Sequence, residues 1–424
     1  MHILLIHQAF VALGEPGGTR HHELARYLAQ RGHGVTIIAS PVSYLTGQVS
    51  EAGEPSGGDL LDEHITILRT YTYSALHRSF IHRVLSFLSF MASSFWAGLK
   101  VRQVDLVWGT SPPIFQGVTA WALARLKGVP FLFEVRDLWP AFAIDVGVLR
   151  NPLLIKLSLW LERFLYRHAD QMLANSPGFV EHITQHGARE VLVVPNGVDP
   201  FMFDPFENGA GYRQQHDLVG RYIAMYAGAH GMSNDLGVVL EAARILQDQP
   251  EIAVVFVGDG KEKPALQAQA AQMGLHNVYF LPPVPKAGMA QALAAADACI
   301  AILKPIKIYG TVYPNKVFDY MAAGRPVILA IDGVIRQVVE EAEAGVFVQP
   351  GDPAALAEAI CKLVGNRERG VEMGLRGRKH VEAHFDRAEL AGRLAEIFEQ
   401  VAKKLAVAIL LELRRSSPGR DPGL

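Results

Sequence analysis

The stretch YPNKVFDYMAAGRPVI, residues 313–328, contains on a small scale the helix-then-strand order that decides the fold. Its Pro-Asn opening breaks the preceding structure, a run with helical character follows, and Gly324 ends that run before a β-branched segment. Lys316 and Asp319 fall in the predicted first turn of this helix. Free backbone N–H groups point the same way at a helix start, so the pattern favours a ligand site there.

The whole chain has the size and composition of two globular domains. It contains 424 residues, half of them hydrophobic, which is too many for one ordinary core. A formal net charge of −2 provides no field that would recruit nucleic acid. Cys299 and Cys361 are far apart in sequence, which argues against a disulfide framework and favours a reducing compartment. The N-terminal MHILLIHQAF does not resemble a signal peptide and predicts a buried strand, so we expect a cytoplasmic protein.

Short hydrophobic strands alternate with helices along both halves of the chain. The predicted strands of the first half are HILLIHQ, GVTIIAS, ITILRTY, VDLVWG, PFLFEV, QMLANS and VLVVP, with helices such as residues 20–31 and 116–127 between them. After residue 196 the strands are YIAMYAG, IAVVFVG, VYFLPP, ACIAIL, PVILAI and GVFVQP, with helices at 236–247 and 289–295. This alternation predicts two doubly wound α/β domains, each a parallel sheet with helices on both faces.

A segment rich in Pro, Asn and Gly, residues 193–205, separates the two patterns. We predict an N-terminal domain over residues 1–199 and a C-terminal domain over 200–385. A helix over 386–411 is expected to pack back on the N-terminal domain, and the polar tail 412–424 to be disordered. Ligands of such sheets bind outside the carboxyl ends of the strands, so two facing domains would form a central cleft.

An uncharged run rich in large apolar residues, VLSFLSFMASSFWAGL at residues 84–99, has 16 residues and four serines. It is short for a membrane span, which needs about 20 apolar residues. Its large apolar residues recur at helical spacing, and basic residues flank it. Two interpretations stay open: a helix buried in the first domain, or an interfacial helix that dips into a bilayer with basic residues at the headgroups.

Three loops carry residues suited to binding an anion. In GEPGGTRHHELARYL, residues 14–28, Gly17 and Gly18 let backbone approach a ligand at a helix start, although an ordinary turn has the same composition. In VGDGKEKPAL, residues 257–266, lysines at a helix start oppose the macrodipole, which fits a bound anion or a solvated turn. In AGAHGMSND, residues 227–235, the possible hydrogen-bond donors to a phosphate or sugar are His230, Ser233 and Asn234.

A fourth segment, FEVRDLWPAF at residues 133–142, places charged residues at the end of a predicted strand. Its candidates are Glu134, Arg136, Asp137 and Trp139, which would face the cleft. A structural ion pair among them is the alternative. No Cys/His cluster suggests zinc, and no Gly-x-Ser-x-Gly suggests a hydrolase, so we expect no metal and no cofactor.

Together these segments resemble the family 4 glycosyltransferases of the GT-B fold, and the resemblance covers nearly the whole chain. It rests, in order, on PGGTRHHELARYLAQRGHGVTII, VPFLFEVRDLWP, VVPNGVDPFMF, VGDG and PNKVFDYMAAGRPVI. The RDLWP and PNKVFDYMAAG segments are most similar to the subgroup that builds bacterial O-antigen, capsule or other surface glycans, including N-acetylfucosaminyl transferases.

The resemblance implies a retaining, metal-independent transfer of a sugar, expected to be an N-acetylated hexosamine, from a UDP-sugar to a lipid-linked or glycan acceptor. The acceptor would arrive at the inner face of the cytoplasmic membrane through residues 84–99. The implied donor-binding residues are Gly17, Gly18, His230, Asn234, Gly258, Lys261, Thr311, Lys316 and Asp319. The implied acceptor-binding residues are Arg20, Glu134 and Trp139, and the implied catalytic residues are Arg136, Asp137 and Lys316.

The chain departs from the family pattern near residue 311. The family has two glutamates separated by seven residues, of which the second binds the ribose hydroxyls and aligns with Asp319. The first, which approaches the sugar ring, aligns with Thr311. Backbone N–H groups of residues 309–312 are expected to replace that acid.

Two further departures concern charge. The Arg and Lys that neutralise the diphosphate in many relatives are absent from residues 227–235, so we expect Lys316, or Lys261 as second choice, to supply the charge. Arg136 stands where many relatives have a histidine, which favours Asp137 on the acceptor side.

Two other functions stay open from the sequence. A UDP-sugar 2-epimerase shares the two-domain architecture but needs acidic and histidine residues in the cleft that no motif here supplies. A catalytically degenerate nucleotide-sugar-binding partner would explain the missing acid and the missing Arg/Lys pair. Release of UDP that requires an acceptor separates a transferase from both, and epimerisation of the donor alone favours the epimerase.

Overall fold

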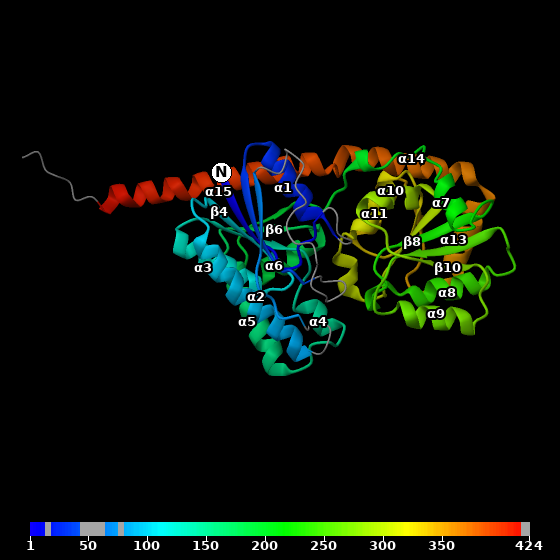
Figure 1. Cartoon of the computed structure of the whole chain (residues 1–424), viewed down its shortest axis with the longest axis horizontal. Helices are drawn as coiled ribbons and strands as arrows, with labels where there is room; N and C mark the ends of the chain where they lie inside the picture. Colours follow the sequence, from blue (N-terminus) through cyan, green and yellow to red (C-terminus); the bar gives the residue numbers. More distant parts are fainter. Residues whose placement is uncertain (13–17, 43–63, 75–79, 417–424) are drawn as a thin grey trace, which may run out of the picture.

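The computed structural model describes residues 1–12, 18–42, 64–74 and 80–416. They form two α/β domains side by side, and two helices run along one side of the molecule, α14 (Arg367–His384) over the C-terminal domain and α15 (Arg387–Ser416) over the N-terminal domain (Figure 1). Each domain is built on one sheet, and every pairing between named strands is parallel. The predicted fold class, two doubly wound Rossmann-like domains, is confirmed.

The N-terminal sheet has the strand order β3-β2-β1-β4-β5-β6-β7. Its strands are β1 (His2–Ile6), β2 (Gly34–Ala39), β3 (Ile65–Arg69), β4 (Leu106–Ser111), β5 (Phe131–Val135), β6 (Gln171–Ala174) and β7 (Val191–Val193). Its helices are α1 (Arg20–Gln30), α2 (Phe80–Lys100), α3 (Phe115–Lys127), α4 (Ala141–Asp145), α5 (Pro152–His168) and α6 (Val180–Gln185). The order reverses between β1 and β4, which is the point where ligands of such sheets bind.

The C-terminal sheet has the order β10-β9-β8-β11-β12-β13. Its strands are β8 (Tyr222–Ala227), β9 (Ile252–Val257), β10 (Val278–Leu281), β11 (Ala298–Ile302), β12 (Val327–Ala330) and β13 (Gly345–Phe347). Its helices are α7 (Ala210–Gln215), α8 (Leu236–Ile245), α9 (Lys263–Gln272), α10 (Lys286–Ala294), α11 (Asn315–Ala322), α12 (Val334–Glu341), α13 (Pro353–Gly365) and α14 (Arg367–His384). Every residue of β8, β9, β11 and β12 is buried, as a parallel sheet covered on both faces requires.

The last helix, α15 (Arg387–Ser416), returns to the N-terminal domain and packs along α1. The Phe398 ring lies 5.3 Å from that of Trp108, which places it in the core of that domain. Arg387 fastens the crossing, because its guanidinium forms an ion pair with Glu23 and donates to backbone carbonyls of the linker. The helix continues to residue 416, so the predicted disordered tail is wrong for residues 412–416, and residues 417–424 lie outside the described residues.

The two domains touch through loops at the carboxyl ends of their strands. The Ser176 hydroxyl, just after β6, donates to the Thr311 carbonyl at 2.5 Å, in the 3₁₀ helix that follows β11. A side chain at Gly178 could not fit, because its Cβ would lie 2.5 Å from the same carbonyl oxygen. Phe142 and Tyr309 add a ring contact at 5.5 Å. The carboxyl edges of the two sheets therefore face the same contact region.

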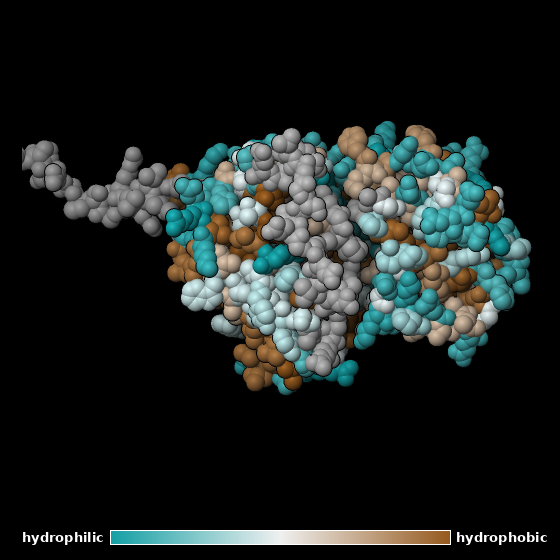
Figure 2. Space-filling model, viewed as in Figure 1, coloured by the Kyte–Doolittle hydropathy of each residue, from teal (hydrophilic) through white to brown (hydrophobic). Residues whose placement is uncertain are grey.

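The helix that covers residues 84–99 has two different faces. Phe90 is fully buried against the neighbouring helix α3, whereas Trp96 is 66% exposed. The exposed large apolar residues of α2 and of the nearby α5 are Ile81, Leu85, Leu88, Trp96, Leu153, Leu154, Leu157 and Trp160. We name them the α2–α5 apolar surface, part of which is visible at the end of the N-terminal domain far from α15 (Figure 2). Among the described residues, no helix is long and apolar enough to span a bilayer.

Candidate functional site

Two glycine-rich loops are pressed together at the carboxyl edge of the C-terminal sheet. A Cβ on Gly258 would lie 2.0 Å from the Gly228 carbonyl oxygen, and a Cβ on Gly260 would lie 2.5 Å from that of His230. The His230 N–H donates to the Asp259 carbonyl at 2.8 Å and joins the loops. Glycine is needed here by loop packing, and the predicted donor contact of Gly258 stays a prediction.

Lys316 lies directly beside these loops, because a Cβ on Gly228 would be 3.2 Å from its Nζ. It is the second residue of α11, a helix whose first turn receives no side-chain cap. Its Nζ donates to the Tyr226 hydroxyl at 2.6 Å and to Asn234 Oδ1 at 3.2 Å, and it lies 4.0 Å from the centre of the Tyr226 ring. Both partners are neutral, and burial lowers the pKa of Lys316 to about 7. The protonated amine of Lys316 therefore has no counter-charge among its hydrogen-bond partners in the described residues, and an anionic ligand would supply one.

His230 is fully buried although it was predicted to contact the donor. Its ring lies about 6 Å from the rings of Tyr226, Phe256 and Phe280, and neither ring nitrogen has a hydrogen-bond partner among the described residues. Burial lowers its pKa to about 4, so the imidazole is neutral. A contact between this ring and a phosphate would require the ring to leave its aromatic surroundings.

The other predicted cations near α9 have different environments. Lys261 is exposed and precedes the helix. Lys263 donates to the carbonyls of Gly258 at 2.7 Å and Leu281 at 3.1 Å, so it joins the ends of two strands. Lys316 is therefore the better placed of the two proposed phosphate lysines.

The region around Thr311 differs from expectation. The Thr311 hydroxyl donates to the Ile308 carbonyl at 2.6 Å. The N–H groups of Tyr309 and Val312 donate to the carbonyls of Ile306 and Tyr309, so the expected replacement of the missing acid stays a prediction for residues 310 and 311. Asp319 is half-buried and is the fifth residue of α11, one position beyond the predicted first turn.

A closed ion pair lies under the carboxyl edge of the N-terminal sheet. The Glu134 carboxylate, on β5, accepts from Arg20 at 2.5 Å and from His21 Nε2 at 2.9 Å, and both the Arg20 and Glu134 side chains are 2% exposed. Burial alone would raise the pKa of Glu134, but Arg20, His21 and Arg136 outweigh it and hold the pKa at about 2. Glu134 forms a structural ion pair, but its partner is Arg20, which lies outside the segment 133–142 in which the alternative placed the pair. Arg20 and Glu134 lie beneath the surface that an acceptor would reach.

His7, which the sequence reasoning missed, connects this edge to Arg136. Its Nδ1 donates to the Thr110 hydroxyl at 2.8 Å, and its Nε2 accepts from Arg136 at 3.2 Å. This pattern requires a neutral ring, and burial, with His21, Arg136 and Arg20, lowers its pKa well below the ordinary value. The sequence could have indicated His7 by its position, because it directly follows the first strand, β1, where the strand order reverses.

Asp137 and Trp139 lie at the accessible part of the edge. The Asp137 side chain is exposed, yet the surrounding protein desolvates it enough to raise its pKa to about 6. Trp139 is half-buried with its ring 6.0 Å from Phe115. Gly18 is exposed, and a Cβ there would meet no atom within 4 Å among the described residues. Gly17 lies outside the described residues.

The carboxyl edge of the N-terminal sheet also carries a narrow pocket beside α2. Residues that follow β1, β2 and β4 meet this helix there. The lining residues include Gln8, Ser40, Thr72, Ser86, Phe87 and Pro113. The pocket therefore connects the candidate acceptor side with the helix that carries half of the α2–α5 apolar surface.

Comparison with known proteins identifies this architecture. Residues 17–197 match the model of the glycosyl transferase 4-like domain, and residues 221–366 match that of glycosyl transferases group 1. WcaI of Escherichia coli, a candidate colanic acid biosynthesis glycosyl transferase, is 26% identical over 80% of this chain and 86% of its own length. The D-inositol 3-phosphate glycosyltransferase of Geodermatophilus obscurus is 29% identical over 96% and 89%. The crystal structure of HepE of Anabaena in complex with UDP-glucose has a TM-score of 0.72 at 18% identity and covers 94% of this chain and all of HepE.

Fold and site together define a two-domain enzyme of the GT-B class. The chain belongs to the family 4 glycosyltransferases.

Proposed function

We propose that this glycosyltransferase moves a sugar from a UDP-sugar to a lipid-linked saccharide during assembly of a cell-surface polysaccharide or glycolipid, with retention of configuration. The observation that carries the proposal is Lys316, a half-buried cation at the start of α11 whose hydrogen-bond partners are neutral. A nucleoside diphosphate has the charge that this position lacks. The E. coli and Anabaena relatives support the proposal through a polysaccharide pathway and a UDP-sugar complex in their names.

On the donor side, Lys316 and the N–H groups at the start of α11 would hold the diphosphate. As the bond from the anomeric carbon to the phosphate oxygen breaks, negative charge grows on the diphosphate, and fixed positive groups stabilise it most at that moment. No metal is needed for this step. Asp319, one turn further along α11, would accept hydrogen bonds from the ribose hydroxyls.

On the acceptor side, Asp137 offers an accessible carboxylate at the end of β5. It would orient the acceptor hydroxyl, with Arg136 beside it. The acceptor oxygen bonds to the anomeric carbon on the face that the phosphate leaves, and the departing phosphate oxygen takes its proton. Contact of the two domains around the donor would exclude water and suppress hydrolysis.

The α2–α5 apolar surface supports a lipid-linked acceptor. Helix α2 contains no acidic residue, and Glu162, the single acid of α5, is buried. The exposed charges of the two helices are therefore basic, which suits an anionic bilayer surface. The pocket lined by Ser86 and Phe87 of α2 is also lined by Gln8, which follows His7 at the carboxyl edge of the N-terminal sheet.

The first test measures thermal unfolding with UDP, GDP, dTDP and UDP-N-acetylhexosamines. A ligand at 100 times its dissociation constant should stabilise the protein by roughly 2.7 kcal/mol. We expect a selective shift with uridine nucleotides that persists in EDTA. No shift with any nucleotide contradicts the donor assignment.

A second assay follows UDP release from each donor with and without extracted membrane lipid as acceptor. Transfer predicts release that requires the acceptor. Binding without release favours a degenerate partner, and epimerisation of the donor alone favours the epimerase.

Membrane contact is tested by sedimentation with anionic vesicles. Replacing Leu157 and Trp160 by serine should reduce binding, whereas replacing the exposed Val219 and Val371 of the C-terminal domain should not. Equal binding by all three proteins contradicts the membrane assignment.

A further inference from the structure

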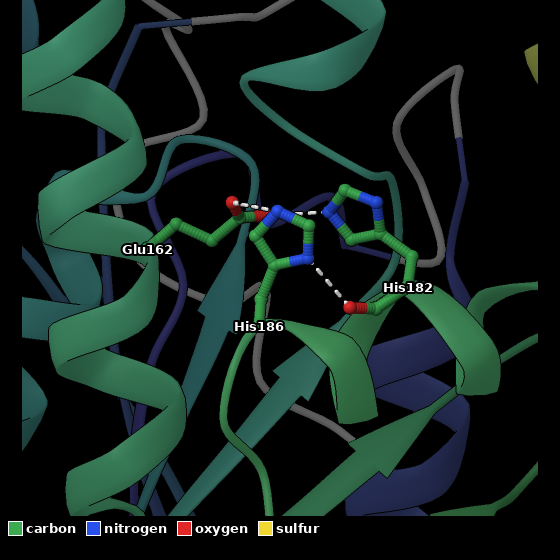
Figure 3. A group of neighbouring side chains, drawn as sticks. All are labelled: Glu162, His182 and His186. Atoms are coloured by element: carbon green, nitrogen blue, oxygen red, sulfur yellow. Dashed lines mark hydrogen bonds and ion pairs between the residues drawn. The ribbon is translucent and has the colours of Figure 1, made fainter.

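A cluster of three potential metal ligands lies between α5 and α6, away from the residues assigned to transfer. Glu162 projects from α5, and His182 and His186 project from α6 and the residue that ends it (Figure 3). Their candidate ligand atoms all lie within 4.8 Å of one another. The two imidazole rings stack at 3.9 Å, and both face the Glu162 carboxylate.

One oxygen of this buried carboxylate lacks a hydrogen-bond donor. Glu162 is 0% exposed, and its Oε1 accepts from the Tyr166 hydroxyl at 3.1 Å and from His182 Nε2 at 2.8 Å. Its Oε2 has no hydrogen-bond partner among the described residues, and the nearest cation candidate is His186 Nε2 at 3.8 Å. A buried carboxylate oxygen without a donor is strongly unfavourable, so something else should satisfy it.

The orientation of His186 decides what that something can be. Its Nδ1 lies 2.7 Å from the His182 carbonyl oxygen, which can only accept, so Nδ1 carries the proton. In the neutral ring Nε2 then carries a lone pair, and this lone pair faces Glu162 Oε2. Two acceptors that face each other across 3.8 Å are brought together by a cation between them.

We propose that Glu162, His182 and His186 bind a divalent transition-metal ion of the zinc type. Two imidazoles and one carboxylate are a donor set that zinc accepts, with a fourth position for water. In a tetrahedral site with metal–ligand distances of about 2.0–2.1 Å, neighbouring donor atoms are about 3.3 Å apart. The observed separations, 2.8 Å from Glu162 Oε1 to His182 Nε2 and 3.8 Å from Glu162 Oε2 to His186 Nε2, lie on either side of that value.

The surroundings match those of a metal ligand. Metal-binding histidines typically donate their second ring nitrogen to a backbone carbonyl, as His186 does. Tyr166 supports the carboxylate in the same way from the next turn of α5. The His182 and His186 side chains are 21% and 19% exposed, which leaves a route for the ion.

The sequence reasoning found no zinc motif because it searched for Cys/His clusters. The spacing His-x-x-x-His is present at residues 182–186 but is common on helices. The third ligand is 20 residues away from His182 on another helix, and only the packing of α6 against α5 brings it near. The proposal therefore departs from the expectation that the chain holds no metal.

A metal here would fasten two functional regions together. Helix α5 carries half of the α2–α5 apolar surface, and α6 directly follows the turn whose Gly178 meets the C-terminal domain. The ion would stiffen this connection and take no part in the transfer chemistry. Its binding can therefore be measured independently of activity.

The test uses the full-length chain, stripped with EDTA and titrated with Zn²⁺ against a chromophoric competitor. We expect one tightly bound equivalent and a rise in Tm. Loss of a supporting hydrogen bond weakens metal binding by roughly 10–100-fold, so Tyr166→Phe should fall in that range. His182→Gln and His186→Gln remove a ligand and should weaken binding more.

The matched control is His384→Gln. His380 and His384 on α14 have the same spacing, with rings 4.7 Å apart, but belong to no such cluster among the described residues. This substitution should leave the tight site intact. Co²⁺ should bind to the same site and give the visible absorption bands of tetrahedral coordination, which checks ligand geometry without substitution.

Three outcomes overturn the proposal: no zinc binding by the wild-type chain, equal binding by all variants, or loss in His384→Gln alone. A wild-type chain that binds no zinc, with His186→Gln less stable than wild type, would make the cluster an ordinary ion pair.

Discussion

The carboxyl edges of the two sheets treat buried charge in opposite ways. At the N-terminal edge, Glu134 has its counter-charge in Arg20 and a further donor in His21, so the group is complete without a ligand. At the C-terminal edge, the described residues give Lys316 the Tyr226 hydroxyl and the Asn234 amide oxygen as hydrogen-bond partners, both neutral, and burial lowers the pKa of Lys316 to about 7. The charge at the N-terminal edge is therefore neutralised within the protein, whereas the charge at the C-terminal edge needs a bound anion to neutralise it.

This difference separates stability from binding. A change at the closed edge should damage folding and leave the affinity of the folded protein for the donor nearly intact. A change at the open edge should damage donor binding and leave folding intact. The experiments on Glu134 and Lys316 measure both stability and function, so a result with the roles of the two edges exchanged contradicts the comparison.

The largest effect is expected for Glu134→Gln. It leaves the Arg20 guanidinium buried without a carboxylate, and removal of one partner from a buried pair costs about 3–5 kcal/mol. Urea denaturation should report this loss in the free energy of unfolding. UDP affinity, measured well below the denaturation midpoint, should change little.

The double variant Glu134→Leu with Arg20→Met is the control. Replacing both charges by apolar side chains is often nearly neutral, so most of the loss should be recovered. A double variant as unstable as the single one would mean that the Arg20 bond to the Val194 carbonyl, at 3.1 Å, matters more than the ion pair.

Lys316→Met should have the next largest effect, on activity. Removing one group that stabilises developing charge typically reduces kcat by about 10²–10³, or roughly 2.7–4 kcal/mol. Stability should stay equal or rise, because an amine without a counter-charge leaves the interior. Steady-state kinetics and denaturation on the same preparation measure both.

Lys261→Met is the matched control, since Lys261 is exposed and was the second candidate for the phosphate charge. It should leave kcat/KM within a few-fold of wild type. A larger loss in this variant than in Lys316→Met would transfer the phosphate role to the loop before α9.

Much of the fold was predictable because its signals are local. The strands IAVVFV and YIAMYA are uninterrupted apolar runs, and every residue in both is buried in the sheet. Helix ends were less certain. Gly288 weakens the helical pattern before Met289, so the predicted start at 289 missed a helix that begins at Lys286.

A site residue could be predicted when a local sequence motif indicated its role. It could not be predicted when its environment depends on residues that only the folded chain brings together. Lys316 stood out because it follows the Pro-Asn opening of a helix. His230 looked equally suitable, but the loop folds its ring under Tyr226, and no local pattern shows that. The alternative for Glu134 was an ion pair within residues 133–142, whereas its actual partner, Arg20, is 114 residues away in sequence.

A smaller effect is expected for Asp319→Asn. Hydrogen bonds to a charged group contribute about 1.5–3 kcal/mol, so UDP affinity should fall by roughly 10- to 150-fold. The wild-type preference for UDP over 2′-deoxy-UDP should shrink in the variant. Calorimetry of both ligands with both proteins gives the four binding free energies of a thermodynamic cycle that tests this. A preference that stays unchanged would place the ribose elsewhere on the C-terminal edge.

The smallest effect is a pH dependence of stability and of donor affinity, at most about tenfold in the equilibrium constant per pH unit. It should come from Lys316 at the C-terminal edge and not from Glu134 at the N-terminal edge. The pKa of Lys316 in the folded protein is about 7, below its ordinary value of 10.5, so the unfolded chain holds more protons between these values. Stability of the ligand-free protein should therefore rise with pH in this window. A bound diphosphate favours the protonated amine, so affinity for the intact UDP-sugar should fall over the same window. Glu134, with a pKa of about 2, stays ionised throughout and contributes to neither slope. Both slopes should be absent in Lys316→Met, and a wild-type affinity that is flat from about pH 7 to 9 would show that the anion completes some other charge.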